Sequence, residues 1–370
     1  MDFINDFINI VFVPLSIISL FFFQPPFLFF KYLFSALRAF FFTEDVAGKV
    51  VLITGASSGI GEHLAYEYAK RRACLALVAR REHRLQQVAA TAEKIGSPNA
   101  IFIPGDVSKL EDCQRFVDAT VNHFGRLDHL VVGAGVCPVS MLEDIPDITK
   151  MASAMDINFW GSVYSSYFAI PYLKTTKGKM IVIASFASCL PLPRMSLYSA
   201  SKAAVVSMYE TLRVELGHEI GITIVSPGLI NTEMTQGKFL NQQGRLEVDK
   251  EMKDVQVSVM PMESVSKCAK SIVNAACRGE KNLIEPAWYR AVFFCKVFLP
   301  ETIEWSNRFF LVPRHGHSQR DTISKKTVDL VNKIKDFLIT SIEIFYFSWL
   351  LPFMDDKSLM HHAGTVNLDT

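Results

Sequence analysis

Residues 49–61 read Lys49-Val50-Val51-Leu52-Ile53-Thr54-Gly55-Ala56-Ser57-Ser58-Gly59-Ile60-Gly61. The apolar run predicts a buried strand, and apolar residues at helical spacing from 62 to 72 predict a helix after the turn. In such a turn the first glycine permits the reversal, the second lets backbone amides approach a pyrophosphate, and the third allows close helix–strand packing. The free amides and the dipole at the helix N-terminus favour anions. An ordinary strand–turn–helix is the alternative, but the flanking elements favour a dinucleotide site at Gly55, Ser57, Ser58, Gly59, Ile60 and Gly61.

Strand and helix signals alternate through the rest of the central region. Further strands are predicted at Leu75–Ala79, Ile101–Pro104, His129–Val132, Met180–Ala184 and Gly221–Ser226. Helices are predicted at Arg84–Ile95, at Lys109–Phe124, around Met155–Leu173 and at Leu197–Leu216. This alternation predicts an α/β protein with a doubly wound parallel sheet, in which ligands bind outside the carboxyl ends of the strands.

Tyr198 and Lys202 lie four residues apart in the last of these helices, so their side chains share one face. A free tyrosine has a pKa near ~10, and a neighbouring cation favours the phenolate and lowers that pKa. Such a pair alone is usually surface decoration. Here Ser185 directly follows the strand Met180–Ala184, and the dinucleotide turn lies upstream. Together these features indicate an acid–base site beside a bound dinucleotide.

The full set of motifs resembles the short-chain dehydrogenase/reductase family, whose Rossmann fold binds a nicotinamide dinucleotide. The resemblance runs from about Gly48 to Ile284. It is carried by Thr54-Gly-x-x-x-Gly59-x-Gly61, Asp106-Val107, Asn158, Ser185, Tyr198-x-x-x-Lys202 and Pro227-Gly228. A hydrophobic N-terminal arm and an apolar C-terminal extension narrow it to the 11β-hydroxysteroid dehydrogenase-like group, to which the oil-body steroleosins of plants belong.

The resemblance implies catalytic roles for four residues. Ser185 would hydrogen-bond the substrate oxygen and orient Tyr198, and Tyr198 would exchange a proton with the substrate. Lys202 would lower the pKa of the phenol and bind the nicotinamide ribose. Asn158 would hold a water near Lys202, and a mid-helix asparagine is otherwise unhelpful to its own helix. No metal is required.

The resemblance also implies further cofactor contacts. Asp106 and Val107 would contact the adenine. The residues Pro227, Gly228, Ile230 and Thr232 would line the nicotinamide side. The family usually has Asn-Asn-Ala-Gly after the fourth strand, whereas this chain has Val132, Gly133, Ala134 and Gly135. The glycines still permit close backbone approach to a cofactor, but the side-chain support of the sheet by two amides is missing.

The end of the second strand indicates which dinucleotide is bound. An acid there suits the ribose hydroxyls of NAD, and an arginine suits the 2′-phosphate of NADP. Arg80 and Arg81 follow the strand, with no acid before Glu82. Two solvated arginines are the alternative, but bidentate arginine–phosphate pairing favours NADP(H).

The amino-acid composition excludes some classes of protein and favours others. The net charge is +1, so nothing electrostatic favours a nucleic-acid partner. Half of the residues are hydrophobic and 29 are phenylalanine, which is heavy for a soluble domain. The seven cysteines are odd in number and scattered, which favours reduced, structural thiols in a domain on the cytosolic side and offers no zinc site.

Residues 1–45 are predicted to anchor the chain to a membrane or lipid droplet. Ile10–Phe30 carries no charge and has the length of a membrane span. The prolines at 25 and 26 favour an inserted arm over Phe7–Gln24, a bend, and an interfacial arm over Phe27–Phe42 with Lys31, Ser35 and Arg38 on one stripe. A simple span is the alternative. Both place the catalytic domain on the cytosolic side of a lipid droplet or the endoplasmic reticulum.

Residues 46–285 form the predicted catalytic domain, and residues 286–370 form an extension that caps the substrate, forms a homodimer or touches lipid. Thr327–Leu351 is predicted as a helix whose end, Phe345–Leu351, is strongly aromatic. Glu233–Met262 is the expected substrate loop. The lipid-side anchor and aromatic extension favour a lipophilic alcohol or ketone such as a steroid, and a keto-lipid or retinoid would suit equally. A lipid-droplet coat or sterol-binding protein with little turnover is the alternative from a different class.

Overall fold

The computed structural model describes residues 2–41, 43–313, 317–318 and 320–335. Its central feature is a seven-stranded sheet in the order β3-β2-β1-β4-β5-β6-β9, with every neighbouring pair parallel. The strands are β1 (Val50–Thr54), β2 (Cys74–Ala79), β3 (Ala100–Pro104), β4 (His129–Val132), β5 (Lys179–Ile183), β6 (Gly221–Pro227) and β9 (Asn282–Glu285). The prediction of a doubly wound parallel sheet is confirmed.

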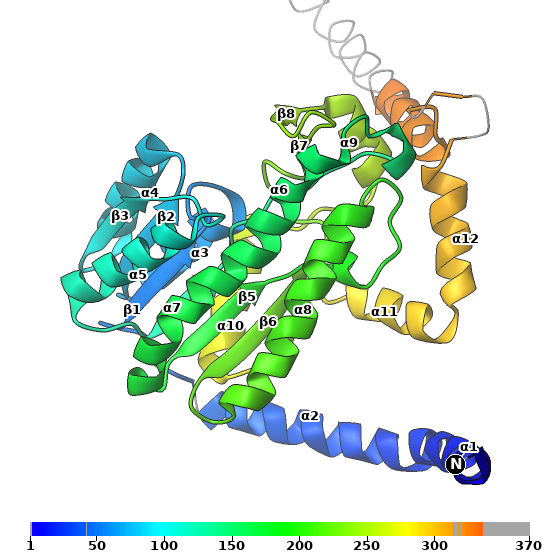
Figure 1. Ribbon diagram of the computed structural model, residues 1–370, viewed down its shortest axis with the longest axis horizontal. Helices are drawn as coiled ribbons and strands as arrows, with labels where there is room; N and C mark the ends of the chain where they lie inside the picture. The colour runs from blue at the N-terminus through cyan, green and yellow to red at the C-terminus, as the bar shows by residue number, and fades with distance from the viewer. Residues whose placement is uncertain (1, 42, 314–316, 319, 336–370) are drawn as a thin grey trace, which may run out of the picture.

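Helices cover both faces of this sheet (Figure 1). One face packs against α3 (Gly59–Lys70), α4 (Glu82–Ile95) and α10 (Val265–Arg278). The other packs against α5 (Leu110–Phe124), α7 (Gly161–Thr176) and α8 (Ser196–Leu216). Val51 and Ile53 of β1 enter the first core, and Val50 and Leu52 enter the second. Because β1 is buried on both faces, its sequence is a continuous apolar run.

The segment between β6 and α10 has more regular structure than predicted. The expected substrate loop contains a short antiparallel hairpin and a helix, namely β7 (Lys238–Leu240), β8 (Leu246–Val248) and α9 (Lys250–Val257). Strand β9 was also not predicted from the sequence. Strands β7 and β8 have only three residues each, too few to show a period. Strand β9 lacks the continuous apolar run that made the equally short β4 recognisable.

The C-terminal part begins with α11 (Tyr289–Phe298) and α12 (Pro300–Leu311), which pack against each other beside the domain (Figure 1). A further helix covers residues 323–335, so the beginning of the helix predicted at Thr327–Leu351 is present. The rest of that helix, with the aromatic run Phe345–Leu351, lies outside the described residues.

The N-terminal arm is helical throughout residues 2–41, as α1 (Asp2–Ile18), a π turn η1 (Ser19–Phe23) and α2 (Gln24–Phe41). The bend predicted at Pro25 and Pro26 does not interrupt the helix: the prolines lie in the first turn of α2, directly after the π turn. A proline has no amide to donate, and a π turn just before it accommodates the lost hydrogen bonds without ending the helix. In Figure 1, α2 extends away below the domain and α1 is foreshortened at its far end, so the helical axis still changes direction there. Phe3–Lys31 is long and apolar enough to cross a membrane, with a mean hydropathy of 2.1.

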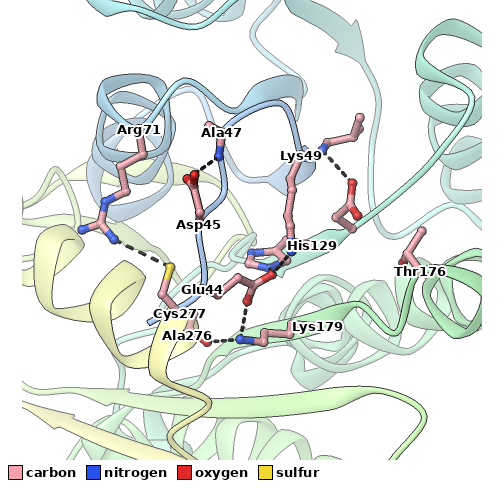
Figure 2. A network of polar contacts seen from close by, with 12 residues as sticks. Glu44, Asp45, Ala47, Lys49, Arg71, His129, Thr176, Lys179, Ala276 and Cys277 are labelled. Carbon is pink, nitrogen blue, oxygen red and sulfur yellow. Dashed lines mark hydrogen bonds and ion pairs between the residues drawn. The ribbon is translucent and has the colours of Figure 1, made fainter. Parts of the chain in front are cut away.

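A buried polar cluster joins the linker after α2 to the domain (Figure 2). The carboxylate of Glu44 forms ion pairs with Lys49 and Lys179, and it accepts a hydrogen bond from His129 Nε2 at 3.2 Å. His129 Nδ1 lies 3.0 Å from the Tyr68 hydroxyl. Burial lowers the pKa of His129, which favours the neutral ring, and with Nε2 donating to Glu44 the Nδ1 atom then accepts from Tyr68. Burial acts to raise the pKa of Glu44, but His129 and the two lysines hold it well below its ordinary value. The linker is thereby fixed to the amino ends of β4 and β5.

We expect Glu44→Gln to destabilise the detergent-solubilised chain by about 3 kcal/mol, because it leaves Lys179 without its buried partner. The exposed neighbour Asp45, which accepts only from the Ala47 amide among its described contacts, provides the control Asp45→Asn. Urea unfolding between pH 7 and pH 3 measures both. Since the folded pKa of Glu44 is lowered, its contribution is complete above its unfolded pKa of ~4.3 and is lost as the pH falls through the folded pKa. As the pH falls, the free energy of unfolding should therefore decrease less steeply for Glu44→Gln than for the wild type or Asp45→Asn. Equal dependence on pH in the three proteins would contradict the role assigned to Glu44.

Candidate active site

A cavity of about 300 Å³ lies at the carboxyl ends of the strands. Loops after six strands of the sheet contribute to its lining. The structure brings together there all but one of the site residues predicted from the sequence: Gly55, Ser57, Ser58, Gly59, Ile60, Gly61, Arg80, Arg81, Asp106, Val107, Gly133, Ala134, Gly135, Ser185, Tyr198, Lys202, Pro227, Gly228, Ile230 and Thr232. The exception is Asn158, which is fully buried behind the lining.

The glycine-rich turn after β1 has the shape that a pyrophosphate needs. Gly55 has a φ of +74°, and a Cβ there would lie 2.8 Å from backbone atoms of Ala134. Gly59 has a φ of +60°, and a Cβ there would lie 3.3 Å from Thr232. Ser58 precedes the first turn of α3 without capping it by a side-chain hydrogen bond, so the amides at this N-terminus are available to an anion. The residues therefore fit the phosphates of a dinucleotide.

A threonine hydroxyl connects the loops that follow β1 and β4. Thr54 Oγ1 donates to the Val131 carbonyl at 3.2 Å and accepts from the amides of Gly133 at 3.0 Å and Ala134 at 3.4 Å. These contacts bridge the ends of β1 and β4. The sequence departure at Val132-Gly133 thus leaves the two loops connected.

Asn158 lies in a π turn, η4 (Asp156–Trp160), between α6 (Ala152–Met155) and α7. Its side chain accepts from the Val136 amide at 2.8 Å and donates to the Val136 carbonyl and to Ser201 Oγ, both at 2.9 Å. A Cβ at Gly135 would lie 3.2 Å from Asn158 Oδ1 and 3.4 Å from Lys202 Nζ. Asn158 therefore ties the loop after β4 to α8, the helix of Tyr198.

Tyr198 and Lys202 are both buried, at 7% and 5% exposure. Lys202 Nζ donates to the Ile183 carbonyl at 2.9 Å. Ser185 Oγ accepts from the Ala187 amide at 3.1 Å, at the start of the single turn η5 (Phe186–Ser188). Strand β5 and helix α8 thus present the serine, the phenol and the ammonium at one end of the cavity.

Burial dominates the electrostatics of this pair. It raises the pKa of Tyr198 well above the ordinary value; the nearby Cys137 adds to the rise, and a hydrogen bond with Ser185 opposes it. Burial lowers the pKa of Lys202 to about 8. The sequence predicted that Lys202 would lower the pKa of the phenol, and the direction found in the protein itself is the opposite. The reason is that both groups leave water together, which favours their neutral forms.

The two arginines predicted to select the dinucleotide differ in their contacts. Arg81 Nη2 donates to Ser58 Oγ at 2.6 Å and to Ser57 Oγ at 3.2 Å, and Nη1 donates to the Glu233 carboxylate. Arg80 also lines the cavity and is exposed to solvent. Glu233 was predicted only as the first residue of the substrate loop, and its contact with Arg81 was not predicted.

Two further features of the site were missed. Tyr198 belongs to an apolar cluster with Cys137, Val139, Ala187 and Phe239, against which Leu192, Met195, Met234 and Met252 also pack. Tyr289, at the start of α11, accepts from the Leu229 amide at 3.2 Å, and its ring fills the space where a side chain at Gly228 would lie. Phe239 lies in the expected substrate loop, but the sequence did not single it out; Tyr289 comes from a segment distant from the motifs, so sequence spacing could not reveal it.

Comparison with known proteins identifies the class. The chain belongs to the short-chain dehydrogenase family, whose family model matches residues 49–243. It is 53% identical to 11-beta-hydroxysteroid dehydrogenase A of Sesamum indicum over 329 residues, covering 89% of this chain and 94% of that protein. It is 51% identical to 11-beta-hydroxysteroid dehydrogenase 1A of Arabidopsis thaliana over 330 residues, covering 89% of this chain and 94% of that protein. The chain is therefore a short-chain oxidoreductase related to these plant proteins.

A solved structure agrees with the fold. A short-chain dehydrogenase/reductase of Burkholderia phymatum, determined in complex with NAD, aligns with a TM-score of 0.62 at 25% identity, covering 71% of this chain and 96% of that one. The overlap supports the assignment of the seven-stranded sheet and its flanking helices to this family.

The close approach of Gly55 to the backbone of Ala134 can be tested by substitution, with Gly48 as a matched control. Gly48 and Gly55 share a positive φ, +71° and +74°, but a Cβ at Gly48 would meet nothing within 4 Å. Gly48→Ala should cost about 1 kcal/mol of stability through backbone strain alone. Gly55→Ala adds a collision with Ala134, so it should cost at least about 2 kcal/mol more and weaken dinucleotide binding. Thermal unfolding and nucleotide titration measure the two effects; equal losses in the two variants would mean that the loops can separate.

Proposed function

We propose that this chain is an NADP(H)-dependent oxidoreductase that interconverts a secondary alcohol and a ketone in a lipophilic substrate, with a hydroxysteroid or sterol as the favoured class. The observation that carries the proposal is the position of Tyr198. Tyr198 lines the cavity at the carboxyl ends of the strands and also belongs to the apolar cluster that contains Phe239, against which Met252 packs. A residue there can serve a cofactor on one side and an apolar substrate on the other.

The proposed chemistry divides between cofactor and protein. A bound nicotinamide dinucleotide supplies the hydride acceptor or donor. The turn at Gly55 to Gly61 holds its phosphates, and Asp106 and Val107 hold its adenine. Pro227, Gly228, Ile230 and Thr232 line the nicotinamide side, where Tyr289 keeps the loop in place.

The residues of the chain then handle one proton. Ser185 Oγ hydrogen-bonds the substrate oxygen. In reduction the Tyr198 hydroxyl gives its proton to the ketone oxygen; in oxidation the phenol first passes its own proton towards the neutral amine of Lys202, and the phenolate then takes the proton of the alcohol. The raised pKa of Tyr198 keeps its proton at rest. Lys202, whose pKa is lowered to about 8, has an amine that can pass a proton near neutral pH. Asn158 holds the loop that carries Gly135 against Lys202.

The choice of NADP(H) rests on Arg80 and Arg81, because a bidentate guanidinium suits a 2′-phosphate. Arg81 already contacts Ser57 and Ser58 at the phosphate turn. The choice of substrate rests on the apolar cluster and on the plant relatives named as 11-beta-hydroxysteroid dehydrogenases. A keto-lipid or a retinoid would meet the same apolar surface.

We further propose that residues 1–45 anchor the enzyme in an endoplasmic reticulum or lipid-droplet membrane, with the catalytic domain of residues 46–285 in the cytosol. Large apolar side chains of α1 and α2 are exposed, including Phe12, Phe22 and Phe29. Exposure of so many aromatic side chains to water is unfavourable, and lipid would cover them. Residues 286–370 would extend the substrate side or contact a second copy or lipid.

Tyr198→Phe should abolish turnover and leave cofactor affinity within a few-fold, since only the proton path is lost. General acid–base catalysis contributes at least ~10²-fold, so retention of more than roughly a tenth of the wild-type rate would contradict the role of Tyr198. The assay follows NADPH with hydroxysteroids and lipid alcohols. Cofactor and steroid binding without turnover in the wild type would support a binding protein instead.

Fusing residues 1–45 to a soluble reporter should direct it to lipid droplets or the cytosolic face of the endoplasmic reticulum. Replacing Pro25 and Pro26 with Leu restores two backbone donors, which should straighten the helix, favour a bilayer span and reduce droplet targeting. Microscopy and protease protection of an N-terminal tag measure both effects. A protected tag in the unmutated fusion would show a span with its amino end in the lumen and would overturn the inserted-and-returning arm.

A further inference from the structure

Glu233 bridges two cations inside the dinucleotide cavity. Its carboxylate oxygens accept from Arg81 Nη1 at 3.1 and 3.2 Å, and one of them also accepts from Lys238 Nζ at 2.7 Å. The three residues come from different parts of the chain: Arg81 precedes α4, Glu233 follows β6, and Lys238 begins β7. All three line the same cavity as Ser57 and Ser58.

Positively charged side chains outnumber negatively charged ones at the end of the cavity where Arg81 contacts Glu233. Arg80, Arg81 and Lys238 bring three positive charges, and Glu233 is the acidic residue of the cavity lining near them. Burial acts to raise the pKa of Glu233, but hydrogen bonds from Lys238 and Arg81 keep it below its ordinary value. The carboxylate is therefore ionised at neutral pH and neutralises one of the three cations.

Another anion can replace the Glu233 carboxylate in its ion pairs with Arg81 and Lys238. The side chains of Arg81, Glu233 and Lys238 are 35%, 41% and 30% exposed, so water and salt screen their attraction. A phosphate monoester carries up to two negative charges and three acceptor oxygens, more than a carboxylate can offer. The guanidinium of Arg81 would keep its contacts to Ser57 and Ser58 during such an exchange, because they use Nε and Nη2, whereas Glu233 uses Nη1.

We propose that Glu233 is an internal counter-ion of the 2′-phosphate subsite, which the phosphate displaces from Arg81, and that Lys238 is a second phosphate-binding cation. The inference rests on the proposed NADP(H) function and deepens it. NAD(H) leaves the Glu233 bridge in place, whereas NADP(H) replaces it.

The test is calorimetric titration of the full-length, detergent-solubilised chain with NADP⁺ and NAD⁺ at low salt. Glu233→Gln removes the competing charge and should tighten NADP⁺ at least about 3-fold while NAD⁺ changes less than about 2-fold. Lys238→Met removes a charge-assisted bond and should weaken NADP⁺ by about 10-fold with little effect on NAD⁺. The matched controls are Glu247→Gln and Lys250→Met, on β8 and at the start of α9, which lie outside this cavity and should leave both affinities unchanged.

A double variant separates displacement from a general structural effect. In an Arg81→Met background, Glu233 has no guanidinium to release, so adding Glu233→Gln should no longer tighten NADP⁺ by the same factor. Circular dichroism melting confirms that each variant is folded.

Three results would overturn parts of the argument. If Glu233→Gln leaves the NADP⁺/NAD⁺ preference unchanged, or weakens NADP⁺, Glu233 is not a displaced counter-ion. If Lys238→Met weakens both dinucleotides equally, Lys238 does not read the 2′-phosphate. If the folded wild type binds neither dinucleotide, the proposed function fails and this inference fails with it.

Discussion

The close contact between the loops after β1 and β4 is the constraint on which the site depends. At Gly55 the backbone passes so near Ala134 that a single Cβ would lie 2.8 Å from it. That approach allows Thr54 Oγ1 to reach the amides of Gly133 and Ala134, and so to join two strands at their carboxyl ends. A larger residue at Gly55 would separate the loops, and the phosphate turn and the loop next to Lys202 would then move apart.

The fold also shifts the pKa values of Tyr198 and Lys202. Strand β5 and helix α8 bury Tyr198 and Lys202 together, and low polarity drives both toward their neutral forms. A phenol that keeps its proton is a poor base in the resting protein, but under the proposed function it can give that proton to a ketone oxygen. In the proposed oxidation of an alcohol, the phenol must first pass its own proton towards the neutral amine of Lys202, and the phenolate then takes the proton of the alcohol.

Much of the sheet and most of the cavity lining could be predicted from the sequence because their determinants are local. The turn at Gly55 to Gly61 and the helical spacing of Tyr198 and Lys202 lie within short windows. The Arg81–Glu233 pair joins residues 152 positions apart, and the Glu44–His129 contact joins residues 85 apart, so no local pattern encodes either. The shift in the pKa of Tyr198 was predicted with the wrong sign for a related reason: spacing shows that a cation is near, but only packing shows how much water is lost.

The extension beyond residue 285 is structurally part of the site. Tyr289 packs on Phe186 with ring centroids 4.7 Å apart and hydrogen-bonds the loop after β6, so it touches segments from both sides of the cavity. Farther on, Asn307 of α12 donates to the Pro191 carbonyl at 3.0 Å, and Arg194 Nη1 donates to the Leu311 carbonyl at 2.7 Å. The segment that follows Ser185 is therefore braced by α11 and α12. The Glu44 cluster fixes the linker after α2 at the amino ends of β4 and β5, whereas α11 and α12 pack beside the segment that follows the carboxyl end of β5 (Figures 1 and 2).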